Sequence, residues 1–209
     1  MRTATVIKTL LAVAAVGAPL VGNAESNFQT GAAGLTATAH VDFQITIPKF
    51  LFLRVGTGTG TAAGGFATNA AIDLITWAPT AAQVGNGTAL AGTGGDLTGG
   101  VETAVVVANN GNVTFSSTTT GPLNDGGGDT ISYAKITTTA TANTTGTTLA
   151  APALADGATT TLTLTAVGKI VQQDAKWAYT YANNTTPPAG TYGGVNTNGG
   201  RVTYTASVP

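Results

Sequence analysis

An unbroken alternation of apolar and polar residues near the N-terminus constrains the fold more than any other feature of the chain. The stretch LTATAHVDFQITI, residues 35–47, has an apolar residue at every second position: Leu35, Ala37, Ala39, Val41, Phe43, Ile45 and Ile47. Successive side chains of a β-strand point to opposite faces, so this pattern predicts a strand with one buried and one solvated face. Such a strand would be about 43 Å long at roughly 3.3 Å per residue. It therefore needs an extended apolar surface to pack against.

The residues that precede this stretch are typical of a secretory signal peptide. Arg2 and Lys8 are followed by an apolar run from Leu10 to Val21 and by the small-residue sequence Gly22-Asn23-Ala24. A membrane anchor is the alternative, but the run is shorter than the roughly 20 residues that span a bilayer, and a proline interrupts it. We predict a signal peptide over residues 1–24, export through the periplasm to the exterior or the cell surface, and no membrane span after cleavage.

Composition excludes several classes of function for the mature chain, residues 25–209. Only 8% of the residues are charged, and removal of Arg2 and Lys8 takes the formal net charge from −1 to −3. A nucleic-acid partner is not expected, because binding phosphates needs a dense basic surface. The chain has no cysteine, so disulfides, thiol catalysis and thiolate metal sites are excluded.

Short apolar or alternating runs, separated by glycine, asparagine and proline, recur along the rest of the chain. Thr and other β-branched residues are frequent in them, and such residues favour strands. The pattern predicts an all-β protein, a single antiparallel β-sandwich over residues 25–209. Its expected strands lie at 50–55, 71–77, 101–108, 112–117, 131–140, 159–167, 169–173, 176–182 and 201–208. A disordered low-complexity chain is the alternative, which the 43% content of hydrophobic residues disfavours.

Residues that could perform catalysis or bind a cofactor are few. His40 is the only histidine, and we interpret it as a solvated residue on the polar face of the long strand. Asp125 and Asp129 could surround a calcium ion, but a plain turn needs the same residue types. The Gly-rich stretch 58–63 lacks the helix that a dinucleotide site requires. The carboxylates are spread singly along the chain. We predict no enzyme activity, no catalytic residues, no cofactor and no metal site.

The C-terminal residues resemble a known family. The segment PAGTY, Pro188 to Tyr192, and the final alternating run RVTYTASV are similar to the end of secreted fimbrial, pilin-like subunits of the chaperone–usher and spore-coat-U type. This resemblance implies an immunoglobulin-like sandwich that is one strand short, completed by an N-terminal strand donated from a neighbouring identical subunit. It also implies a dedicated periplasmic chaperone as a partner. Residues 25–47 are then the candidate donor, with the seven apolar residues at 35–47 as the assembly strand.

Two questions stay open at this point. The strand at 35–47 could instead bend at a bulge and belong to both sheets of its own sandwich. The protein could also be a secreted carbohydrate-binding or adhesion module, because Trp177, Tyr179 and Tyr181 would share one face of a strand, with Trp77 and Tyr192 as further candidates for sugar stacking. The exposure of these aromatic side chains separates the two functions.

Overall fold

The structure of the chain, a computed structural model, describes residues 26–209. The folded unit runs from Pro48 to Pro209. Residues 26–47, called the N-terminal segment below, lie outside it and contain no strand. The predicted signal peptide falls outside the described residues.

The larger sheet has five strands, and every pairing in it is antiparallel. Its path runs from β1 (Leu51–Val55) through β3 (Val101–Ala108) to β9 (Val171–Tyr181), and β7 (Ile136–Ala142) pairs with the far side of β9. The short β2 (Leu90–Ala91) continues the line of β3 along β9. The central strands β3 and β9 are rich in valine and aromatic residues, which fit a pleated, buried surface.

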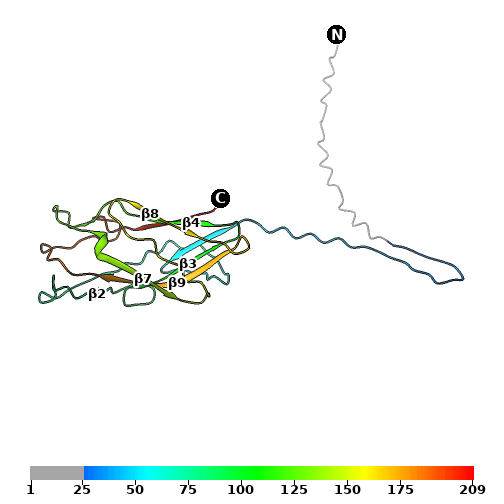
Figure 1. Cartoon of the computed structure of the whole chain (residues 1–209), viewed down its shortest axis with the longest axis horizontal. Helices are drawn as coiled ribbons and strands as arrows, with labels where there is room; N and C mark the ends of the chain where they lie inside the picture. Colours follow the sequence, from blue (N-terminus) through cyan, green and yellow to red (C-terminus); the bar gives the residue numbers. More distant parts are fainter. Residues whose placement is uncertain (1–25) are drawn as a thin grey trace, which may run out of the picture. The chain divides into compact units, whose positions relative to one another are not determined.

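The second sheet has three antiparallel strands. In it β4 (Val113–Thr118) lies between β10 (Thr203–Ser207) and β8 (Thr159–Leu164). Figure 1 shows β4 and β8 in one layer of the folded unit and β3, β7 and β9 in the other. A small hairpin of β5 (Leu123–Asn124) and β6 (Thr130–Ile131) and a single 3-10 turn, Tyr133–Lys135, complete the elements. The prediction of an all-β antiparallel sandwich is confirmed.

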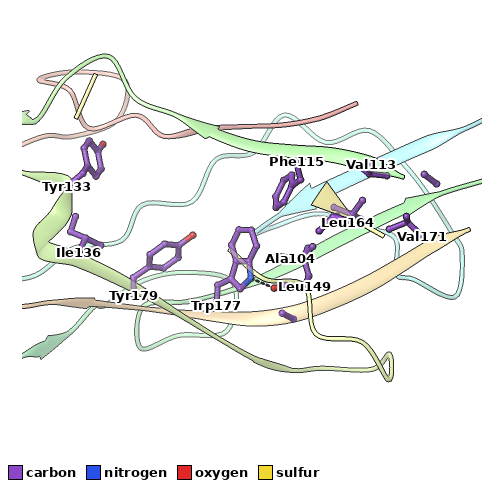
Figure 2. Packing of buried hydrophobic residues seen from close by; sticks show 13 residues of the cluster. Ala104, Val113, Phe115, Tyr133, Ile136, Leu149, Leu164, Val171, Trp177 and Tyr179 are labelled. Atoms are coloured by element: carbon purple, nitrogen blue, oxygen red, sulfur yellow. Dashed lines mark hydrogen bonds between the residues drawn. The ribbon is translucent and has the colours of Figure 1, made fainter. Parts of the chain in front are cut away.

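The core lies between the two sheets and is built around three aromatic rings. Trp177 on β9 and Phe115 on β4 are fully buried, with ring centroids 6.0 Å apart. Tyr204 on β10 contacts both rings, at 5.3 Å from Trp177 and 6.1 Å from Phe115. The indole Nε1 of Trp177 donates a hydrogen bond to the carbonyl of Leu149 at 2.8 Å, drawn as a dashed line in Figure 2. These contacts join three strands of two sheets into one core.

Most of the predicted strands exist, but three predictions need correction. The run at 71–77 forms no strand and makes only an isolated bridge between Thr76 and Thr93. The run at 131–140 is broken by the 3-10 turn. The runs at 169–173 and 176–182 are one continuous strand, β9, because Asp174 lies inside the ladder instead of ending it.

Candidate functional site

The N-terminal segment is extended and exposes the apolar side chains of its alternating pattern. Phe43 is 90% exposed and Ile45 86%, and Leu35, Val41 and Ile47 are exposed as well. No residue from 34 to 50 lies in a turn or bend, and none from 26 to 50 lies in a strand. A row of exposed apolar side chains this long marks an interaction surface.

One side of β1 has no partner strand. It pairs with β3 through residues Leu51 to Val55, and no described residue pairs with its other side. Its inward side chains, Leu51, Leu53 and Val55, pack against the main core but stay half-buried, whereas the inward residues of the neighbouring β3 are fully buried. The core is therefore incompletely covered at β1.

One side of the C-terminal strand β10 also has no partner strand. It pairs only with β4, and its inward residues Tyr204, Ala206 and Val208 are half-buried although they contact the core. Strands β1 and β10 belong to different sheets but lie next to each other. We call their adjacent free edges, with these half-buried residues, the open margin. A strand with unpaired backbone groups is a template for another strand.

The opposite margin of the sandwich, between β7 and β8, is closed by the chain itself. Leu149 and Pro152 are fully buried there. The backbone carbonyls of Ala153 and Ala155 accept hydrogen bonds from the hydroxyl groups of Ser117 and Thr119, at 3.0 and 2.6 Å. Segment 149–155 thus fills the space between the sheets on that side. On the open margin the segment that follows β1 is only partly buried: Ile75 and Trp77 contact the core, but no residue from 63 to 84 is fully buried.

Three of the five aromatic residues that could have formed a sugar-stacking surface lie in the core, whereas Trp77 and Tyr192 are half-buried. Trp177 is fully buried, and Tyr179 and Tyr181 are at most 8% exposed. Tyr179 donates or accepts a hydrogen bond with the hydroxyl of Tyr204 at 3.1 Å, and the Trp77 ring packs 6.4 Å from that of Tyr181. Because the rings of β9 face inward, they offer no flat surface to a sugar.

The loop with Asp125 and Asp129 is a hydrogen-bonded turn. One carboxylate oxygen of Asp125 accepts the backbone N–H groups of Gly127, Gly128 and Asp129 at 2.8 to 3.1 Å, and these bonds lower the pKa of Asp125. Within residues 26–209, no group of three or more histidine, aspartate or glutamate side chains is arranged to hold a metal ion. His40 is exposed, on the N-terminal segment. Residues 58–63 form a loop with a tight bridge between Thr61 and Gly64.

Two carboxyl groups that the sequence places far apart meet at the end of β1. An oxygen of Asp73 and an oxygen of Glu102 converge over Gly56, in the space that a side chain at this position would need. Glu102 is 4% exposed. Burial raises the pKa of Glu102, and the nearby negative charge of Asp73 raises it further, to about 8. The sequence analysis missed this pair; its only signal was a glutamate at an inward position of the apolar run at 101–108.

Comparison with known proteins gives no family model, no curated protein and no solved structure that matches this chain. In the described part of the chain, no helix is long and apolar enough to cross a membrane.

Proposed function

We propose that this protein is a non-enzymatic structural subunit of a bacterial extracellular filament, fimbria or matrix, in which identical copies assemble by β-strand complementation. Residues 35–47 of one copy pair with the open margin of the next, between β1 and β10. The observation that carries the proposal is the coexistence, in one chain, of an extended alternating segment with exposed apolar residues and a sandwich in which two neighbouring strands, β1 and β10, each lack a second partner strand.

The geometry at the start of the folded unit disfavours a tight hairpin between residues 35–47 and β1. A hairpin between residues 35–47 and β1 would need a turn at Pro48–Phe50, and no turn exists there. Instead, Asn109 fixes this stretch as an extension of β1: its Oδ1 accepts the N–H of Phe50 at 2.9 Å and its Nδ2 donates to the carbonyl of Pro48 at 2.8 Å.

Two features of the chain favour strand complementation energetically: exposed apolar side chains that can be buried, and a low content of charged residues. The large apolar side chains of the N-terminal segment each gain about 1.5–3 kcal/mol on full burial, and the four at Val41, Phe43, Ile45 and Ile47 are at least 75% exposed before assembly. Their sum, about 6–12 kcal/mol, is offset in part by the entropy lost on association. The low content of charged residues, 8%, means that few ions lose water when copies pack together.

The alternative function, a secreted carbohydrate-binding or adhesion module, depended on exposed aromatic residues. Trp177, Tyr179 and Tyr181 are buried. We therefore do not favour it.

Competition with a synthetic peptide of residues 35–47 tests the proposed function. The mature chain should form filaments in negative-stain microscopy, and excess peptide should bind the open margin and shorten them. A control peptide of the same composition, with the residues reordered so that the alternation is lost, should have no effect. A mature chain that stays monomeric at high concentration and binds neither peptide contradicts the proposal.

A further inference from the structure

The contact between Asp73 and Glu102 requires a proton. Their oxygens converge over Gly56, and ionised carboxylates only accept hydrogen bonds, so one group can donate to the other only while one of them is protonated. The ionisable groups that face Glu102 are Asp73 from the segment after β1, Asp96 from the β2–β3 connection, Tyr179 on β9 and Tyr204 on β10. None of these is a cation. The nearby Arg54 of β1 donates instead to the carbonyl of Gly58, at 3.2 Å.

The remaining carboxylates are already occupied by other donors. Asp96 accepts the N–H and the hydroxyl of Thr103, at 2.7 and 2.6 Å. Asp73 accepts the N–H and the hydroxyl of Thr57, the hydroxyl at 2.6 Å. Glu102 has only a long bond from the N–H of Asp96, at 3.4 Å. It is therefore the group with the least stabilisation of its ionised form, and the proton resides on it.

This contact closes the base of a long excursion, residues 57–73, that begins where β1 ends. The excursion first covers the outer face of the larger sheet, where Ala62 is buried against Val105 and Val107 and the Phe66 ring lies 4.7 Å from that of Phe52. After Asp73 the chain enters the main core at Ile75 and Trp77. It must therefore cross the edge of the sheet near Gly56. Ala67, Asn69 and Ala71 line a shallow cavity together with residues 52–55 of β1.

We propose that Asp73 and Glu102 form a proton-dependent latch, which holds residues 57–73 beside the edge of β1 and releases them when Glu102 ionises. Release would place two adjacent negative charges, and a third on Asp96, at the base of the excursion. Residues 67–73 would then separate from the edge of β1 that belongs to the open margin. The effect on assembly rests on the proposed function, whereas the latch itself is a property of the single subunit.

The pKa of Glu102 is raised to about 8 from an ordinary value of 4.5. This shift determines how the stabilisation that the latch provides depends on pH. The stabilisation is complete below pH 4.5, decreases as the pH rises, and is lost above about pH 8. Neutral and acidic conditions therefore keep the excursion closed, and mildly alkaline conditions open it.

A spin label on the excursion tests the latch. The chain has no cysteine, so Ala70→Cys, at an exposed position of the excursion, gives a single attachment site for a nitroxide. We expect the electron paramagnetic resonance spectrum of the monomer to change between pH 6 and pH 9.5, with the immobile component falling at least twofold around pH 8. A label at Thr161, an exposed position on β8, controls for global unfolding and should show no change.

Two substitutions complete the test. Glu102→Gln keeps a donor for Asp73 without an ionisable proton, and Asp73→Asn provides a donor to an ionised Glu102, so the label should stay immobile at every pH in both variants. A pH-independent spectrum in the native sequence, or an unchanged midpoint in both variants, overturns the latch. Binding of peptide 35–47 at pH 6 and pH 9 is measured separately. A spectral transition at pH 8 without any peptide binding would keep the latch and refute the proposed function.

Discussion

Substituting Phe43 with aspartate separates folding from assembly. Phe43 is the most exposed large apolar residue of the N-terminal segment, at 90%, and lies outside the folded unit. In the free subunit the substitution removes no buried contact. We expect the free energy of unfolding to change by less than about 0.5 kcal/mol, as for other surface substitutions. Urea denaturation of the monomer, followed by tryptophan fluorescence, measures this.

Assembly should respond very differently to the same change. Burial of the Phe43 side chain against a neighbour is worth about 1.5–3 kcal/mol, and an unpaired carboxylate in an apolar environment adds a further cost. A loss of about 3 kcal/mol or more corresponds to a contact weakened at least about 100-fold. Filament length in negative-stain microscopy and sedimentation at equal subunit concentration give the readout.

Gln44→Asp is the matched control, because it introduces the same charge one residue further along, on the polar face of the alternating pattern. It should leave both stability and assembly nearly unchanged. If Phe43→Asp unfolds the monomer, the segment belongs to its own domain and the donation hypothesis is wrong. If both variants assemble normally, the alternation has no role in binding and the reasoning from period 2 is refuted.

Three further predictions concern the folded unit and the N-terminus. Asp174→Asn should lower the free energy of unfolding by about 2–3 kcal/mol in urea titrations, because this fully buried carboxylate accepts hydrogen bonds from Asn143, Thr144 and Thr145. Burial alone raises the pKa of Asp174, but the threonine donors outweigh it and lower the pKa to about 2, so its stabilisation, present above pH 3.8, should be lost as the pH falls through 2. Phe115→Ala should cost about 3–5 kcal/mol by emptying the centre of the core, whereas Thr114→Ala, exposed on the same strand, should cost less than about 0.5 kcal/mol; unfolding curves of the two variants compare them. N-terminal sequencing of the exported protein should begin Glu25-Ser26-Asn27, and a surface form that retains Met1 would contradict the predicted cleavage.

The strands that were predictable from sequence are those whose pattern is local. The run at 101–108 became β3 residue for residue, because it is bounded by glycine and asparagine on either side. The run at 71–77 is also short and largely apolar but forms no strand. Strand formation also needs a partner edge, and only Thr76 finds one, in Thr93. Which strand a run pairs with depends on packing between distant parts of the chain. The residue pattern of one short run does not give this information.

Of the two parts of the proposed assembly site, only the N-terminal stretch could be recognised in the sequence. The apolar alternation of the proposed donor stretch, residues 35–47, can be recognised from periodicity alone. The open margin does not, because it depends on which strands end up at the edges of two sheets, and β1 and β10 are separated by nearly the whole length of the folded unit. The pair of Asp73 and Glu102 was missed for a similar reason: a contact between carboxyl groups 29 positions apart arises from the path of the excursion, not from a motif.

The pairing of strands that are distant in sequence has a consequence for how the chain acquires its structure. Val101 of β3 pairs with Ala178 of β9, and Thr118 of β4 pairs with Thr203 of β10. Contacts of such large sequence separation make folding slow. The aromatic contact between Phe115 and Tyr204 cannot form until β10 has been synthesised. During that interval the apolar residues of the N-terminal segment and the unfinished sheet edges are exposed together, so the nascent subunit should aggregate most readily just before its C-terminal strand docks.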